Sequence, residues 1–166
     1  ENYGSGVAPF YTTLALWVGC IFLLALMKIT PSTEGLKDPR PYQLFFGRFG
    51  ILFLLGQLQW IVIYIGNIYV LKTQCLHPGR MFLTGAVTSF TFMLLCYAVT
   101  LAFADLGKAI IVVIVVLQIA GSSGTYPIEV LPEFFQKVYV FFPFPYAINA
   151  MRECMFGYYE NDYIIY

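Results

Sequence analysis

Charged residues are scarce in this chain. Asp, Glu, Lys and Arg make up 11% of its 166 residues, whereas hydrophobic residues make up 60%. Soluble domains usually hold roughly 25% charged residues, and one soluble domain of this length could not cover its surface with so few. The net charge is zero, and no basic stripe with interleaved aromatic residues is present. The composition therefore excludes a soluble domain and gives no sign of a nucleic-acid partner.

Groups for catalysis or metal binding are also few. His77 is the only histidine, so this chain alone cannot build a two-histidine metal site. It has no glycine-rich phosphate loop that ends in Lys followed by Ser or Thr, and so it cannot hydrolyse ATP by that route. No nucleophile and base stand in a recognisable arrangement. We therefore expect no enzyme activity and no cofactor.

Long apolar runs are what the chain has instead. A bilayer core of about 30 Å requires roughly 20 apolar residues in helical form, and four stretches approach that length. None has Asp, Glu, Lys, Arg or His in its interior, which argues against a proton relay, a voltage sensor or a secondary transporter. The predicted spans are residues 9–27, 49–71, 81–104 and 109–124, the last reaching 106–125 with its flanking residues.

The charges between the spans predict their orientation. The loops at residues 28–49 and 105–108 hold five basic and three acidic residues, whereas the segments on the other side hold four basic and six acidic residues. Basic loops face the cytoplasm in most membrane proteins. We therefore expect these two loops inside the cell and both ends of the chain outside it.

Uncharged polar residues lie inside the predicted spans. In lipid such side chains usually bond to neighbouring helices, each contributing about 0.6 kcal/mol. The second interpretation is that they line a conduit, and the candidates are Gln57, Gln59, Asn67 and Gln118. Gly85 and Ser89, four residues apart, also form a small-xxx-small pattern that favours close helix packing.

Residues 40–49 predict a short cytoplasmic interfacial helix that leads into the second span. Apolar and aromatic side chains fill its middle and basic residues flank it, a pattern typical of a helix at a membrane surface. It is either an anchored elbow or a lever that passes force from a cytoplasmic partner. The candidate coupling residues are Arg40, Tyr42, Gln43 and Arg48.

The stretch that follows the fourth span combines many aromatic residues with repeated prolines. Proline removes a backbone donor, and non-helical backbone at membrane depth survives only where protein or water surrounds it. We expect two re-entrant outer helices at residues 131–156, the first opening at Pro132 and ending at Pro143, the second opening at Pro145 and capped by Gly157. The candidate outer-gate residues are Pro127, Pro132, Pro143, Pro145, Arg152 and Glu153.

The four cysteines are widely spread. Cys20 and Cys96 lie inside spans, where cysteine acts as a small apolar residue. Cys75 and Cys154 both fall on the predicted outer side, where disulfides persist. A disulfide between them is one open interpretation and two free thiols is the other, because spacing does not show whether they meet.

Two stretches of sequence resemble a known family. The opening YGSGVAPFYTTLALWVGCIFLL and the ending LQIAGSSGTYPIEVLPEFFQKVYVFFPFPYAINAMRECMFGYYENDY are similar to the membrane region of the YhgE/Pip family, the phage infection proteins. That family belongs with the permeases of ABC-type exporters, and the type VII secretion accessory protein EsaA is a relative. The resemblance covers essentially the whole chain and is most specific from Gln118 to Gly157.

The resemblance implies an all-α polytopic bundle of ABC exporter-type permease architecture, in the plasma membrane of a Gram-positive bacterium. It implies a longer parent protein, with an extracellular region upstream and one further span downstream. A homodimer, membrane lipid, an ATPase subunit in trans and secretion-system proteins are the implied partners. The implied function is export of a substrate. The alternative is a scaffold without transport that anchors the extracellular region for type VII secretion or phage adsorption.

Overall fold

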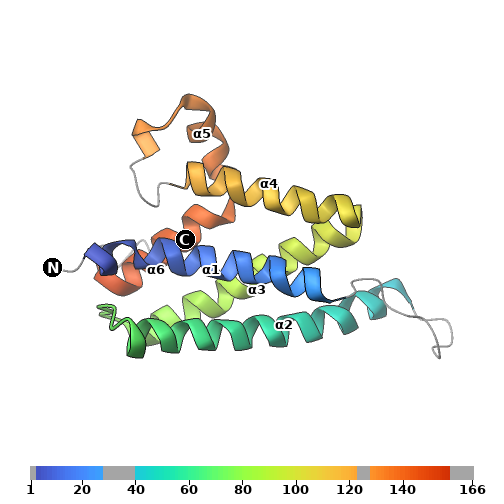
Figure 1. Ribbon diagram of the computed structural model, residues 1–166, viewed down its shortest axis with the longest axis horizontal. Coiled ribbons are helices and arrows are strands. Elements are labelled where there is room, and N and C mark those ends of the chain that lie inside the picture. Colours follow the sequence, from blue (N-terminus) through green and yellow to red (C-terminus); the bar gives the residue numbers. More distant parts are fainter. Residues whose placement is uncertain (1–2, 28–39, 123–127, 158–166) are drawn as a thin grey trace.

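The fold is a bundle of antiparallel helices. The structure is a computed structural model that describes residues 3–27, 40–122 and 128–157, and every regular element in these ranges is helical. Three helices are long and apolar enough to cross a membrane, with the spans at Gly4–Leu26, Pro41–Val70 and Pro78–Phe103. The predicted class, an all-α membrane helix bundle, is confirmed. Its long helices are α1 (Tyr3–Leu26), α2 (Pro41–Ile65), α3 (Pro78–Phe103) and α4 (Asp105–Gly121) (Figure 1).

The ends of these helices fall into two groups (Figure 1). At the α3–α4 end, α1 finishes, α2 begins and α3 turns directly into α4. At the opposite end, the α6 end, α2 finishes, α3 begins and the short C-terminal helices lie. The same connections share a side in the orientation predicted from the loop charges. Which of the two ends faces the cytoplasm stays a prediction.

Several boundaries differ from those predicted. α1 begins at Tyr3 rather than residue 9, with Pro9 inside its second turn. The predicted interfacial helix at residues 40–49 and the second span form one unbroken helix, α2, because no proline lies within it after Pro41. α4 has 17 residues and is about 25 Å long, and the predicted end of the fourth span at residue 125 lies outside the described residues. Its crossing of the bilayer stays a prediction.

The C-terminal prolines begin helices rather than interrupt them. Beyond the 3-10 turn η2 (Ile128–Val130), α5 (Glu133–Val138) follows Pro132, continues into η3 (Tyr139–Phe141), and precedes α6 (Pro143–Phe156). Pro143 opens α6 and Pro145 lies in its first turn, so the predicted division at Pro145 is shifted by two residues. Neither position needs a backbone donor. Gly157 caps α6 with φ +65°, as predicted.

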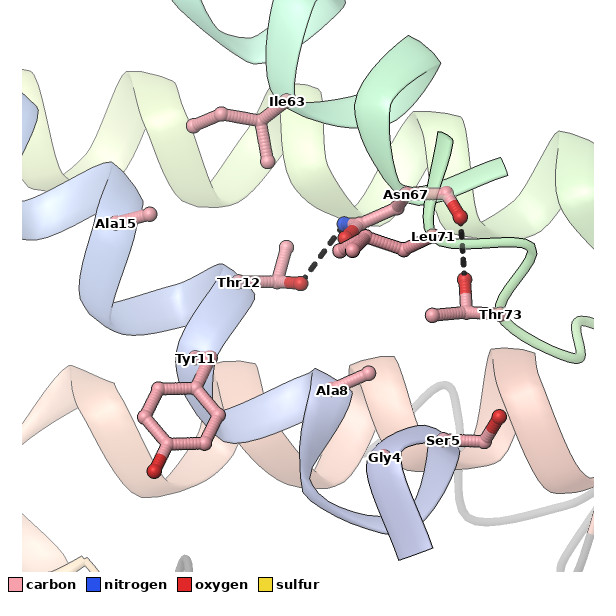
Figure 2. A pocket seen from close by; sticks show the side chains of 10 residues that line it. All are labelled: Gly4, Ser5, Ala8, Tyr11, Thr12, Ala15, Ile63, Asn67, Leu71 and Thr73. Carbon is pink, nitrogen blue, oxygen red and sulfur yellow. Dashed lines mark hydrogen bonds between the residues drawn. The ribbon is translucent and has the colours of Figure 1, made fainter. Parts of the chain in front are cut away.

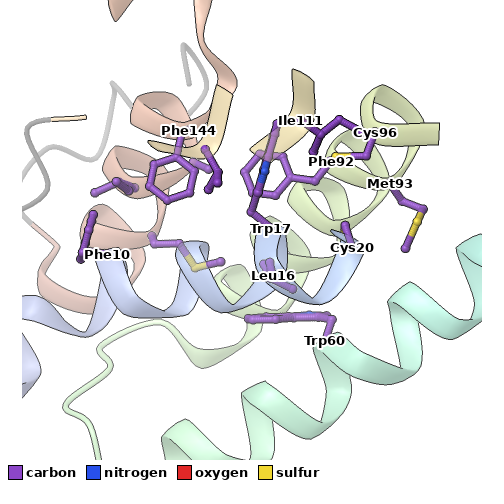
Figure 3. Close-up of a cluster of buried hydrophobic side chains, with 14 of the residues drawn as sticks. Phe10, Leu16, Trp17, Cys20, Trp60, Phe92, Met93, Cys96, Ile111 and Phe144 are labelled. Atoms are coloured by element: carbon purple, nitrogen blue, oxygen red, sulfur yellow. The ribbon is translucent and has the colours of Figure 1, made fainter. Parts of the chain in front are cut away.

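α6 packs into the bundle against α1 and α3. Its buried face includes Phe144, Ile148 and Met151, spaced at helical intervals. The Phe144 ring lies parallel to Phe92 of α3, with ring centroids 6.1 Å apart, and Phe92 meets the edge of Trp17 of α1 at 4.8 Å (Figure 3). Because lipid is as apolar as these side chains, close packing rather than escape from water holds this core together.

α2 and α3 approach closely where one of them lacks a side chain. The Trp60 indole of α2 lies directly over Gly85 of α3, where a Cβ would overlap the ring, and its Nε1–H donates to the Phe82 carbonyl at 3.0 Å. One turn further along, Ser89 Oγ donates to the Gly56 carbonyl at 3.0 Å. The predicted close packing at Gly85 and Ser89 is thus present in the structure.

The turn from α3 into α4 is a single residue. Ala104 has φ +51°, a conformation that side-chain-bearing residues rarely adopt. The tight reversal brings Gly107 so close to α3 that a Cβ there would lie 2.6 Å from the Val99 carbonyl oxygen. The absence of a side chain at Gly107 therefore lets α4 return alongside α3.

Candidate functional site

The last turn of α2 widens into the π-helix η1 (Gly66–Val70). Such turns are rare and are often found at functional sites. The widened turn carries Asn67, whose side chain points towards α1 and is 6% exposed. Its Nδ2 donates to Thr12 Oγ1 at 2.8 Å, and its backbone carbonyl accepts from Thr73 Oγ1 at 2.9 Å (Figure 2).

A cavity of about 640 Å³ lies beside this bond, between α1 and the end of α2. Polar and apolar side chains share its wall, and none of the ten residues that line it carries a charge. Ser5 and Thr12 are buried in the wall, whereas Tyr11 is 58% exposed. The lining residues are Gly4, Ser5, Ala8, Tyr11, Thr12, Ala15, Ile63, Asn67, Leu71 and Thr73 (Figure 2).

Of the four predicted conduit residues, only Asn67 lines this cavity. Gln57 Nε2 donates to the Ala86 carbonyl of α3, and Gln59 Nε2 donates to the Ala15 carbonyl of α1, both at 3.1 Å. These two glutamines join α2 to its neighbours, in agreement with the interhelical interpretation. The structure does not bring the four residues together in one conduit.

Gln118 holds the start of α6. It is fully buried in α4, and its Oε1 accepts from the Phe144 backbone N–H at 3.2 Å. That N–H belongs to the first turn of α6, where no intrahelical acceptor exists. Gln118 therefore acts as a cap supplied by another helix, a role that the sequence does not indicate because it depends on which elements become neighbours.

A second cavity, an open groove of about 360 Å³, lies between α3 and α6 beside their contact. Its wall includes Thr84, Thr88 and Thr91 on α3, opposite Tyr146 and Ala150 on α6. The Thr84 and Thr91 hydroxyls donate to carbonyls one turn earlier in their own helix. Because those hydroxyls are already bonded, this groove offers fewer groups to a ligand than the cavity at Asn67.

The predicted outer-gate residues do not form one cluster. Pro132 caps α5, Pro143 and Pro145 lie in the first turn of α6, and Pro127 lies outside the described residues. Arg152 and Glu153 are half-buried near the other end of α6. A gating role for any of them stays a prediction.

The predicted coupling residues lie at the beginning of α2. Arg40, Tyr42 and Gln43 are exposed, and Arg48 is half-buried. The Gln43 Oε1 accepts from the Arg40 backbone N–H at 3.1 Å, which caps the helix, and the Arg40 guanidinium donates to Tyr42 Oη at 3.3 Å. The first three residues thus present a polar surface at the α3–α4 end.

Cys75 and Cys154 meet at the α6 end. The backbone N–H groups of Leu76 and His77 donate to the carbonyls of Met155 and Cys154, at 3.1 and 3.0 Å. The two cysteines are thiols rather than a disulfide in this structure, and Cys75 Sγ lies 3.6 Å from the Cys154 carbonyl oxygen. Burial raises the pKa of the Cys75 thiol, although the hydrogen bond from the His77 backbone lowers it in part. The sequence alone left open whether Cys75 and Cys154 meet, and the structure shows that they are neighbours.

The residues that sequence analysis missed are the hydroxyls of α1. Ser5 and Thr12 received no role, although they lie on the same face of the helix, seven residues apart. The spacing of Ser5 and Thr12 is visible in the sequence. The partner of Thr12 is not, because Asn67, which bonds to it, lies in the π-helix. Within the described residues, no group of three His, Cys, Asp or Glu side chains could hold a metal ion.

Comparisons with known proteins agree on one family. Residues 1–165 match the profile of a family described as ABC-2 family transporter protein. The chain is 30% identical over 162 residues to the uncharacterized protein YhgE of Bacillus subtilis, which covers 95% of this chain. The same match covers only 20% of YhgE, so the chain spans about a fifth of that protein's length. No solved structure matches the chain significantly.

Proposed function

This chain belongs to the ABC-2 family of transporter proteins, and from that premise we propose that it is the permease part of an exporter in the plasma membrane. The observation that carries the proposal is the cavity at Asn67, which places uncharged polar groups between two apolar, span-length helices. A permanent charge there would be costly in lipid, whereas hydroxyl and amide groups can bind a substrate and release it. The substrate would meet the protein at the α6 end.

Energy for export would come from another subunit. ABC-2 permeases usually work with an ATPase, and the surface of Arg40, Tyr42 and Gln43 at the opposite end from the cavity suits such a partner. We place this end in the cytoplasm, in line with the loop charges. A homodimer is the proposed assembly, with the α6 end outside the cell.

The experiment tests the partner directly. Arg40→Glu reverses one charge at the proposed coupling surface and leaves the Gln43 cap in place. Lys137→Glu, the matched control, reverses an exposed charge on α5 at the other end. We expect an ATPase subunit to co-purify with the natural full-length protein and the control but much less with Arg40→Glu. Equal recovery with both variants would remove the coupling role, and no ATPase with any of them would contradict active export.

A scaffold without transport is the second candidate, favoured by one observation. Four fifths of YhgE lies outside the matched region, so the relative has much more to anchor than this bundle. To separate the candidates, the bundle of the full-length protein would be exchanged for an unrelated bundle with the same number of spans. Type VII secretion and phage sensitivity would survive the exchange if the bundle is only an anchor, and secretion would fail if it exports.

A further inference from the structure

The cavity at Asn67 holds hydrogen-bonding groups that the protein itself does not use. Asn67 Nδ2 bonds to Thr12, but Asn67 Oδ1 makes no hydrogen bond within the described part of the chain. The side chain is nevertheless 6% exposed. Asn67 lines the cavity, so its amide oxygen can accept a hydrogen bond from a molecule bound there.

The hydroxyl of Thr12 differs from those of Thr13 and Thr100 in the bonds that it makes. Its neighbour Thr13 donates to the Pro9 carbonyl one turn earlier, at 2.8 Å, and Thr100 does the same to the Cys96 carbonyl at 2.7 Å. Thr12 Oγ1 only accepts, from Asn67, and in the described residues its proton reaches no protein acceptor. Among the residues that the structure describes, Ser5 Oγ likewise only accepts, from the Gln74 backbone N–H at 3.5 Å.

The cavity therefore offers an acceptor at Asn67 and donors at Ser5 and Thr12, besides the hydroxyl of Tyr11. No charged residue of the described ranges lines it, so an anionic phosphate or a cationic amine would find no counter-charge among them. Hydroxyl groups both donate and accept without charge, and they match this set. The volume of about 640 Å³ falls in the range of small-ligand sites and is far larger than a single water requires.

The surroundings favour a ligand with an apolar tail. The cavity lies between the first turns of α1 and the end of α2, two helices long and apolar enough to span a membrane, and we expect lipid headgroups to begin at these helix ends. Ala8 and Ile63 form the apolar part of its wall, and Leu71 at its edge is 68% exposed. Tyr11 is also exposed there and offers an aromatic ring with a polar tip, a combination suited to the membrane interface.

We propose that this cavity is a binding site for the uncharged, hydroxylated headgroup of a membrane lipid, such as a glycosyl diacylglycerol. The headgroup hydroxyls donate to Asn67 Oδ1 and accept from Ser5 and Thr12, while the tails follow the apolar wall at Leu71 into the bilayer. The proposal goes beyond export, because binding of this kind does not depend on whether the protein transports anything.

Two glycines of the first turns of α1 provide a matched pair for the test. Gly4 lines the cavity and Gly6 does not, yet a Cβ added at either position would meet no atom within 4 Å. Gly4→Leu therefore adds a side chain at the cavity wall, whereas Gly6→Leu makes the same change in helix propensity and hydrophobicity at a residue that does not line the cavity. A second pair is Thr12→Val with Thr100→Val as its control, because Thr100 is equally buried and lies away from the cavity.

The experiment uses the full-length protein in nanodiscs that contain phosphatidylglycerol and monoglucosyl diacylglycerol, with native mass spectrometry to count the lipids retained. We expect the glucolipid to be retained selectively, with an order of magnitude less retained by Gly4→Leu and Thr12→Val and an unchanged amount by the two controls. Equal retention of both lipids, or equal retention by Gly4→Leu and Gly6→Leu, would overturn the proposal. Displacement of the glucolipid by free glucose would assign the site to a soluble sugar, and no retained lipid would leave it to water; either result also overturns it.

Discussion

The two faces of α2 are built differently. Towards α3, Trp60 covers Gly85 and Ser89 bonds to the Gly56 backbone, so the helices meet without space for a ligand. Towards the end of α1, the contact is a bond between two side chains, Asn67 and Thr12, and a cavity lies beside it. At the α2–α3 contact, a polar side chain bonds to backbone next to a small residue, and the helices close on each other. At Asn67 and Thr12, two polar side chains bond to each other, and space remains beside them.

The contact between α2 and α3 should lose more stability on substitution than the contact between α2 and α1. Gly85→Ala places a methyl group inside the Trp60 ring, and the ring cannot move without breaking its bond to the Phe82 carbonyl. We expect a loss of about 3 kcal/mol in the free energy of unfolding, measured by thermal denaturation in detergent. Gly79→Ala is the control, since it lies in the same helix with open space around it. Equal stability of the two variants would show that the faces do not differ.

The α6 end of the bundle should keep a fixed arrangement although it contains the cavity, and Cys75 and Cys154 allow a test of this. Diamide would take two electrons and two protons from the paired thiols, forming a disulfide and the reduced hydrazine. We expect peptide mapping to find this bond, with a gain of about 2 kcal/mol in stability. Because burial raises the pKa of Cys75, the reaction should be faster above pH 8 than at pH 7. Cys75→Ser is the control, and failure to form the bond would mean that the loop after η1 moves away from α6.

The close packing of α2 against α3 was largely predictable from the sequence, whereas the cavity between α2 and α1 was not. Gly85 and Ser89 are spaced by one helical turn, so their pattern alone indicates close packing. Three of the four predicted spans correspond to helices long and apolar enough to cross a membrane, because a bilayer fixes the length and composition of such helices. The π-helix at Gly66–Val70 leaves no such mark, since it depends on how the end of α2 meets the chain that follows. Gln118 shows the same limit: its polarity was visible, but the first turn of α6 that it caps is brought to it only by the tertiary fold.

A double-mutant cycle would measure how strongly the bond between Asn67 and Thr12 holds α2 to α1 beside the cavity. Asn67→Ala and Thr12→Val each remove one partner of the bond between α2 and α1. We expect a coupling energy of about 1 kcal/mol from the unfolding of both single variants and the double variant. A coupling near zero would mean that the bond does not hold the helices. The two sides of the cavity would then be positioned by the Gln59–Ala15 contact, which lies about two turns earlier in α2.

The smallest expected effect tests how much of the seal is polar. Ser89→Ala removes the hydroxyl that donates to the Gly56 carbonyl but keeps a small side chain at the contact. We expect a loss of about 0.6 kcal/mol, the average for such bonds between membrane helices. Thr91→Val is the control, because that hydroxyl is exposed and bonds only within its own helix. If Ser89→Ala cost as much as Gly85→Ala, the polar bond rather than the missing Cβ would hold α2 against α3. The contrast between the two faces would then lie only in which acceptor the polar group finds.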